Sequence, residues 1–237
     1  MDKKSPEPGF RLYRKVADQI AGIIAQEALL PGTRLPSERV LSDRLKVARS
    51  TVREAMIALE IAGQVSIRTG SGIYVDQPGV TTDTDLGAGP LELLDARELI
   101  ECEIAARAAA SIDATQLMAM EISIEAMAAA HGRGTHREAD HAFHIALAKA
   151  TRIEPLVGII DRLWSQMFSP MFERMGALTG LFGEPQDTAL EHHRLILDAL
   201  VARDADLSRQ RMKAHLVEVR RVLLRASAFG AGSSDKG

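Results

Sequence analysis

At 237 residues, with 46% apolar and 26% charged side chains, the chain has the size and composition of a soluble globular protein of two domains. Its single cysteine, Cys102, excludes an intrachain disulfide framework. No apolar run approaches the roughly 20 residues that span a bilayer, and the N-terminal residues contain no export signal. We therefore expect a cytoplasmic protein with no membrane partner.

The net charge of −3 is unevenly distributed. Residues 1–76 carry 12 Lys and Arg against 9 Asp and Glu, whereas the remaining residues carry 17 against 23. The basic excess therefore belongs to the first third of the chain, which is the part that suits a polyanionic partner.

Residues 1–10 contain two prolines and mixed charge, and we predict a disordered arm there. An apolar stripe predicts a first helix over about 12–27. Ser37 can cap a second, short helix, and the segment around Ala48 opens a third that Gly63 ends. Two short alternating strands, 65–68 and 72–75, then flank a glycine-containing turn, which predicts a β-hairpin. The pattern over 11–76 is a winged helix-turn-helix.

The third of these helices begins with two arginines and two hydroxyls on the side opposite its apolar residues. In the major groove, Arg can bind guanine bidentately, and Ser, Thr and backbone N–H groups can hold phosphates. We expect Arg39 and the wing to hold the DNA backbone and the helix to read bases. The predicted DNA-binding residues are Arg39, Arg49, Ser50, Thr51, Arg53, Arg68, Thr69 and Gly70.

The segments PGTRLPSERVLSDRLKVARSTVREAMIALEIAGQV and RTGSGIYV resemble the DNA-binding domain of GntR-family transcription regulators, from about Leu12 to Val75. One departure is Ala48, where the family usually has Ser or Thr; the missing hydroxyl weakens the helix cap by roughly 1 kcal/mol. Since one winged helix reads only a short half-site, we expect a homodimer on a pseudo-palindromic double-stranded operator.

Residues 77–90 are rich in Gly, Thr, Asp and Pro and predict an interdomain linker. Beyond it the pattern is helical throughout, which predicts an all-α bundle over 91–230 and a disordered tail at 231–237. The fold class is therefore mostly α, with a small β-hairpin wing. The predicted helices are 91–111, 114–130, 135–150, 155–175, 187–202 and 205–228, with a loop over 176–186.

Several histidines of this second part lie at core-facing positions. Asp140 and His144 are four residues apart and project from one side of a helix. His193 and His215 lie on apolar stripes, although the stripe does not distinguish His193 from His192. Three imidazoles and a carboxylate could bind a divalent transition metal. A single histidine on an apolar face is more often an ordinary core residue, so spacing alone leaves both interpretations open.

The segments DHAFHIALAKAT, EHHRLILDALVARD and RMKAHL resemble the metal-binding parts of the FCD effector domain, found in the FadR subfamily of GntR regulators. The resemblance implies Asp140, His144, His193 and His215 as ligands of Zn, Ni or Mn, and so favours His193 over His192. It also implies a small carboxylate effector. The segments LLDARELIECEIAARAA and DRLWSQMFSPM further resemble regulators of hexuronate and aldonate use, which points to a sugar acid.

Two residues are candidates for effector binding. Arg97 could pair with a ligand carboxylate, or it could form a structural ion pair with Asp95, Glu101 or a neighbouring helix. Trp164 could line a pocket or simply lie in the core.

The leading hypothesis is an effector-responsive transcription regulator. One alternative is a metal-dependent enzyme, although the chain has no HExxH helix and no evident general base. The other is an architectural DNA-binding protein without an effector.

Overall fold

The computed structural model describes residues 12–76, 86–130, 136–181 and 187–224. They form two compact units. The first unit contains residues 12–76, 86–90, 169–179 and 224, and the second contains 91–130, 136–168, 180–181 and 187–223. The predicted arm at 1–10, the linker up to residue 85 and the tail at 231–237 lie outside the described residues. Within the described ranges, no helix has the length and apolar character needed to cross a membrane.

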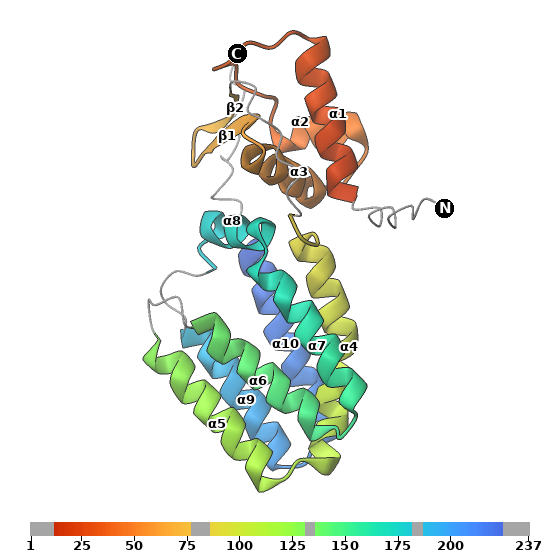
Figure 1. Ribbon diagram of the computed structural model, residues 1–237, viewed down its shortest axis with the longest axis vertical. Coiled ribbons are helices and arrows are strands. Elements are labelled where there is room, and N and C mark those ends of the chain that lie inside the picture. The colour runs from red at the N-terminus through yellow and green to blue at the C-terminus, as the bar shows by residue number, and fades with distance from the viewer. Residues whose placement is uncertain (1–11, 77–85, 131–135, 182–186, 225–237) are drawn as a thin grey trace, which may run out of the picture. The chain divides into compact units, whose positions relative to one another are not determined.

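The first unit has three helices followed by a two-stranded antiparallel sheet (Figure 1). Helix α3 packs on both α1 and α2, and its apolar side chains form the centre of the core. This arrangement confirms the predicted winged helix-turn-helix. The elements are α1 (Leu12–Gln26), α2 (Glu38–Leu45), α3 (Arg49–Ile61), β1 (Val65–Arg68) and β2 (Gly72–Val75).

Local chemistry sets the ends of these helices as the sequence predicts. The Ser37 hydroxyl accepts a hydrogen bond from the N–H of Val40 in the first turn of α2. Gly63 follows the C-cap of α3 with a φ of +69°, a conformation that glycine adopts without strain. Ala48 is the N-cap of α3, and it makes no side-chain cap hydrogen bond.

The wing pairs β1 with β2 in a register that runs from Val65 opposite Val75 to Arg68 opposite Gly72. Gly72 has a φ of +129°, and a Cβ atom added there would lie 2.7 Å from Nε of Arg34. A side chain is therefore excluded at this position both by the backbone conformation and by the close approach of Arg34.

A further helix of the first unit, α8 (Pro170–Thr179), comes from the second half of the chain and packs on α3. The guanidinium of Arg174 donates to both carboxylate oxygens of Glu60, with distances of 2.6 and 2.7 Å. One of these oxygens also accepts from the N–H of Ile67, at 3.0 Å. Glu60 therefore joins α3, the wing and α8.

The predicted single helix over 155–175 is wrong. The chain there forms α7 (Glu154–Ser165), a short 3-10 helix η1 (Gln166–Phe168) and then α8. Pro170 causes the break, because proline has no N–H to continue the helical hydrogen bonds and disfavours helical geometry at Ser169. The predicted loop over 176–186 is also corrected, since α8 continues to Thr179.

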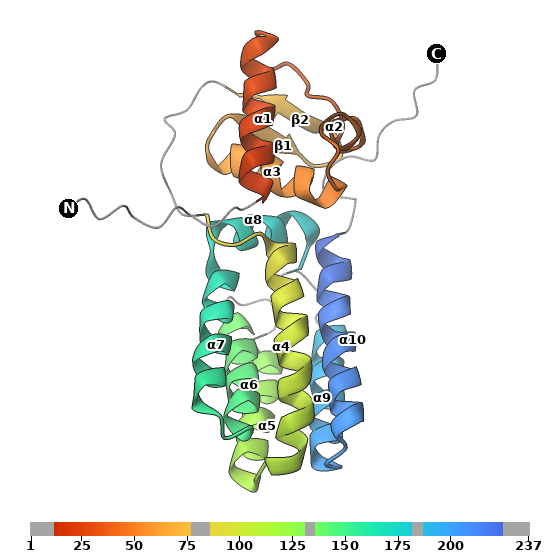
Figure 2. The same ribbon diagram turned by 90° about the vertical axis from the view of Figure 1, so that its right-hand side faces the viewer.

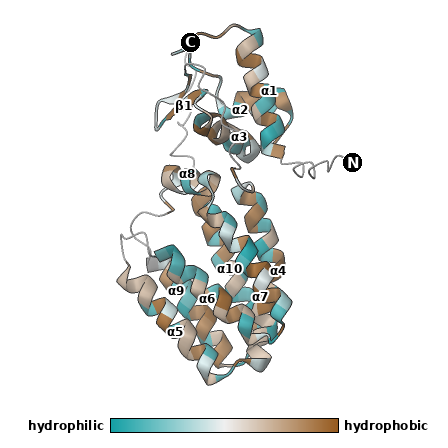
Figure 3. Cartoon of the chain, viewed as in Figure 1, coloured by the Kyte–Doolittle hydropathy of each residue, from teal (hydrophilic) through white to brown (hydrophobic). Residues whose placement is uncertain are grey.

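The second unit is an all-α bundle, as predicted. Helix α6 packs against α5 and α7, α9 packs against α5 and α10, and Figures 1 and 2 show α4 running along the same bundle. Figure 3 shows hydrophobic and hydrophilic residues interspersed along α4 and α10, as expected of helices with one face in a core. The remaining elements are α4 (Pro90–Ser111), α5 (Ala114–Ala129), α6 (His136–Ala150), α9 (Asp187–Val201) and α10 (Ala205–Leu223).

We predict that Ala48→Ser stabilises the protein by about 1 kcal/mol, because a hydroxyl at this extended N-cap can accept from an N–H group in the first turn of α3. The midpoint of urea unfolding is the measurement. Ser37→Ala is the matched control of opposite sign, since it removes the cap that α2 already has. A midpoint that Ala48→Ser leaves unchanged or lowers would contradict the assignment of Ala48 as the N-cap.

Candidate functional site

Most of the predicted DNA-binding residues lie on the surface of the first unit. Ser50 and Thr51, at the start of α3, are half-buried, with backbone N–H groups at the helix N-terminus beside them. The Arg68 guanidinium lies over the ring of Tyr74, 4.4 Å from its centroid, which holds this side chain on the wing. The exposed members of the set are Arg39, Arg49, Arg68, Thr69 and Gly70.

Arg53 is placed differently, because it is 6% exposed. Its Nε and Nη2 atoms donate to the two carboxylate oxygens of Glu38, each at 3.0 Å. This bidentate ion pair joins α3 to α2 and so fixes the position of one helix of the helix-turn-helix against the other. In this structure the Arg53 side chain therefore stabilises the position of α3 against α2 and does not project from the protein surface.

The second unit brings together the four residues proposed as metal ligands. Asp140 and His144 lie on α6, His193 on α9 and His215 on α10. One ligand atom from each lies within 4.8 Å of the ligand atoms of the other three, and the three histidines are at most 3% exposed. His192, which the apolar stripe could not exclude, is half-buried and outside this cluster.

The hydrogen bonds of His193 fix which of its nitrogens faces the cluster. Its Nδ1 lies 2.7 Å from the backbone oxygen of Ala189, and because a carbonyl can only accept, Nδ1 carries the hydrogen. The other nitrogen, Nε2, lies 2.9 Å from Oδ1 of Asp140. Two acceptors at that distance need a positive charge between them, which either a second proton or a metal ion can supply.

The electrostatics of the cluster also suit a cation. Burial alone would raise the pKa of Asp140, but the neighbouring His193 and His144 hold it well below its ordinary value. Burial lowers the pKa of His215 well below its ordinary value, and His193 and His144 act in the same direction. Asp140 is therefore an anion and His215 a neutral imidazole, which are the forms that bind metals.

Glu101 and Arg97, one turn apart on α4, lie directly beside His144. The carboxylate of Glu101 contacts Nδ1 of His144, and it accepts from Nε and Nη2 of Arg97 at 2.6 and 3.3 Å. Burial alone would raise the pKa of Glu101, but Arg97 and His144 lower it to about 2. Of the two possibilities that the sequence left open for Arg97, the structure shows the ion pair with Glu101.

Trp164 on α7 is fully buried between charged and aromatic neighbours. The Arg97 guanidinium lies 4.3 Å from its ring centroid, and the His141 ring stacks on it at 5.5 Å. The indole Nε1 has no hydrogen-bond partner among the described residues. A buried N–H without a partner is costly, so this atom is a donor available to a ligand.

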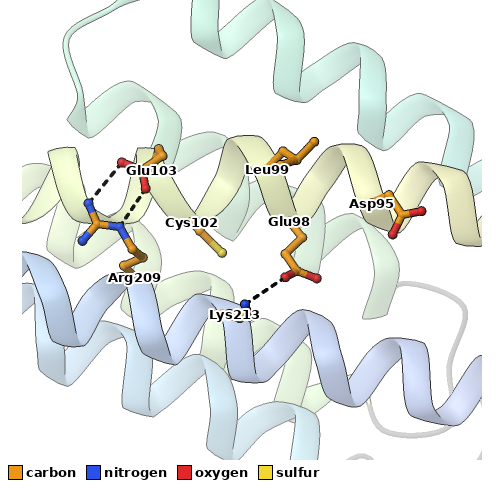
Figure 4. Close-up of a pocket in the computed structure, with 7 residues that line it drawn as sticks. All are labelled: Asp95, Glu98, Leu99, Cys102, Glu103, Arg209 and Lys213. Carbon is orange, nitrogen blue, oxygen red and sulfur yellow. Dashed lines mark hydrogen bonds and ion pairs between the residues drawn. The ribbon is translucent and has the colours of Figure 1, made fainter.

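A separate groove of about 500 Å³ runs between α4 and α10 (Figure 4). Its charges are already paired, Glu98 with Lys213 and Glu103 with Arg209. Burial and the nearby Glu98 raise the pKa of Cys102 to about 11, so its sulfur is a thiol rather than a nucleophilic thiolate.

A winged helix-turn-helix joined to a separate all-α unit is the architecture of a DNA-binding regulator with a second, helical domain. The model of the GntR family of bacterial regulatory proteins matches residues 12–75, and that of the FCD domain matches residues 92–218. The chain belongs to the GntR family of bacterial regulatory proteins and carries an FCD domain.

Curated relatives agree with this assignment. The Uxu operon transcriptional regulator of Escherichia coli K12 is 34% identical over 239 residues, covering 94% of this chain and 91% of that protein. The regulator LutR of Bacillus subtilis is 30% identical over 210 residues, covering 85% of this chain and 96% of that protein. These relatives are transcription regulators, and the chain described here is a regulator rather than an enzyme.

The same fold occurs in a solved GntR-family regulator from Pseudomonas syringae pv. tomato. The TM-score is 0.50 at 22% identity, and the match covers 92% of this chain and 86% of that one.

Proposed function

We propose that this DNA-binding transcription regulator senses a small carboxylic acid, of the sugar-acid class, at a divalent ion held by Asp140, His144, His193 and His215. The observation that carries the proposal is the 2.9 Å approach of His193 Nε2 to Asp140 Oδ1. Three imidazoles and one carboxylate suit Zn, Ni or Mn. When bound, such an ion supplies open coordination positions for the oxygen atoms of an acid.

The adjacent histidines of α9 offer a matched test of the metal site. We expect added Zn²⁺, Ni²⁺ or Mn²⁺ to raise the melting temperature of the metal-depleted protein, because an ion at 100 times its Kd stabilises the folded state by about 2.7 kcal/mol. His193→Ala should abolish this rise and His192→Ala should retain it. Elemental analysis that finds no transition metal, together with an unmoved melting temperature, would contradict the proposal.

Acid recognition is supported by the hydrogen-bonding capacity left on Arg97. Its Nε and one Nη2 hydrogen serve Glu101, whereas the hydrogen-bond partner of Nη1 among the described residues is the sulfur of Met167, at 2.9 Å. A thioether is a weak acceptor, so a carboxylate would be a much better partner for that end of the guanidinium. We propose that Arg97 and the indole N–H of Trp164 both donate to the effector.

We therefore expect a sugar acid to change the DNA affinity of the metal-loaded protein by about 5- to 150-fold, the usual range for coupled sites. Trp164→Phe keeps a large ring but removes the N–H, and it should weaken acid binding by about tenfold or more. Fluorescence anisotropy with labelled operator, titrated with a panel of acids, measures the first effect, and calorimetry measures the second.

The control in these experiments is the melting-temperature response to metal, which Trp164→Phe should retain. If no acid on the panel alters DNA affinity, the chain acts as an architectural DNA-binding protein instead.

For the first unit, we propose that Arg49, Ser50 and Thr51 enter the major groove at the N-terminus of α3. Their position at a helix start combines side-chain donors with free backbone N–H groups. Arg39 and the wing residues would hold the sugar-phosphate backbone. Two copies of the chain would read the two halves of a pseudo-palindromic operator.

Arg49→Ala and Arg53→Ala should have different effects, because we assign Arg49 to DNA contact and Arg53 to holding α3 in place within the protein. Arg49 is exposed, so its loss should cost about 1–3 kcal/mol of DNA affinity and relax sequence preference without changing stability. Arg53→Ala should in addition lower the unfolding free energy by about 3 kcal/mol, because the largely buried Glu38 carboxylate is left without its partner. Urea unfolding and anisotropy on a duplex selected from a randomised pool provide both values.

The outcome that would contradict the assignment of α3 as the reading element is wild-type affinity in both variants. The selected duplex also bears on the dimer: a recovered sequence without two-fold symmetry would count against it.

A further inference from the structure

Glu101 belongs to the cluster without being one of its four proposed ligands. The carboxylate is 1% exposed, and it contacts Nδ1 of His144 on one side and the Arg97 guanidinium on the other. With Nδ1 in contact with this carboxylate, Nε2 of His144 lies 3.4 Å from Oδ1 of Asp140 and 3.5 Å from Nη2 of Arg97. Glu101 therefore orients a proposed ligand, and it also adds a charge to the site.

The negative charge of Glu101 changes the net charge of the whole site. Among the described residues of the second unit, Arg97 and Glu101 are the buried Arg, Lys, Asp and Glu side chains, and Asp140 lies beside them with its side chain 18% exposed. Arg97 contributes +1, Glu101 and Asp140 contribute −1 each, and imidazoles that coordinate a metal are neutral. With neutral imidazoles these three side chains sum to −1, and a divalent ion in place brings the total to +1.

A buried net charge is unfavourable, so the occupant that best completes the site is the one that cancels it. A singly charged carboxylate brings the total from +1 to zero. A doubly charged acid brings it to −1, and a neutral sugar leaves it at +1. Without the charge of Glu101 the ion-loaded site would carry +2, and a dianion would then be the neutralising ligand.

We propose that Glu101 is a specificity-determining residue, which makes the sensor site select an acid with one carboxylate over the same carbon skeleton with two. The inference rests on the metal-bound acid site proposed above and names the charge class of its ligand. Glu101 acts through its charge on the site and through His144, and it is not itself a metal ligand.

The test compares matched acids on the metal-loaded, full-length protein by isothermal titration calorimetry. Galacturonate and galactarate share one carbon chain and differ in having one or two terminal carboxylates, and gluconate and glucarate form a second such pair. We expect the wild-type protein to bind the singly charged member of a recognised pair at least about tenfold more tightly. Glu101→Gln should shift that ratio by about tenfold or more toward the doubly charged member.

Glu103→Gln is the matched control. Glu103 lies two residues away on α4 and also pairs with an arginine, Arg209, but its side chain is 67% exposed, so solvent screens its charge. This variant should leave the ratio between the paired acids at the wild-type value. Metal content is measured in every sample, because loss of the orienting contact with His144 is expected to weaken metal affinity by about 10- to 100-fold in Glu101→Gln.

Two results would overturn the inference. One is a wild-type protein that binds the doubly charged member as tightly as its partner or more tightly, and this result is independent of how any variant folds. The other is a metal-loaded Glu101→Gln protein with the wild-type ratio. If the wild-type protein binds neither pair, the proposed sensing of a sugar acid itself fails, and the inference fails with it.

Discussion

Burial of the Arg97 and Glu101 side chains removes two charges from water, which is unfavourable. The two residues lie one turn apart on α4. A buried ion pair of this kind is often no more stabilising than apolar residues of the same size. What it contributes here is geometry. The carboxylate is held by two guanidinium nitrogens on one side, so its other side is presented to His144 in a fixed position. The orientation of His144, a proposed metal ligand, thus depends on Arg97, which is not itself one of the four proposed ligands.

The first unit also contains a largely buried ion pair that fixes local geometry. Arg53 and Glu38 form a largely buried bidentate pair that fixes α3 against α2, so the exposed residues at the start of α3 are presented from a rigid base. The contrast is with the groove between α4 and α10, where Glu103 and Arg209 are paired but exposed. Pairs of that kind contribute little, about 0–1 kcal/mol, because water and salt screen them. Burial, rather than the number of ion pairs, separates the structural pairs from the ordinary surface ones.

Sequence reasoning predicted what depends on local periodicity and local turn chemistry. The winged helix-turn-helix follows from apolar spacing, from the Ser37 cap and from glycines placed where φ is positive. The apolar spacing continues across Pro170 and predicts one helix, although a proline at this position ends the helical hydrogen bonding. Neither result required knowledge of which segments meet in space.

The site was predictable only in part, because its geometry depends on residues far apart in the chain. Helical spacing does not distinguish His193 from His192. The resemblance to FCD domains favours His193, and the packing of α9 beside α6 and α10 brings His193 next to Asp140. The partner of Arg53 lies on another helix, so nothing in the spacing of α3 could show that this arginine is buried. Glu101 was visible as a possible partner of Arg97, yet its contact with His144 joins α4 to α6 and has no sequence signature.

One continuous segment of the chain connects the proposed acid site to the elements that we propose to contact DNA. The chain leaves Trp164 near the end of α7, passes through η1 and enters α8, where Arg174 holds Glu60 at the far end of the recognition helix. The same Glu60 carboxylate accepts from the N–H of Ile67 in the wing, so a single side chain links α8 to both elements that we propose to contact DNA. An acid bound beside Trp164 can change DNA affinity only by its differential affinity for two arrangements of such a segment.

Coupling between two binding sites is typically about 1–3 kcal/mol. The Arg174 side chain is 37% exposed, so solvent screens its pair with Glu60 and the pair contributes less than a fully buried one. A rearrangement of the Arg174 and Glu60 contact would therefore have to be accompanied by a change in the packing of α8 on α3.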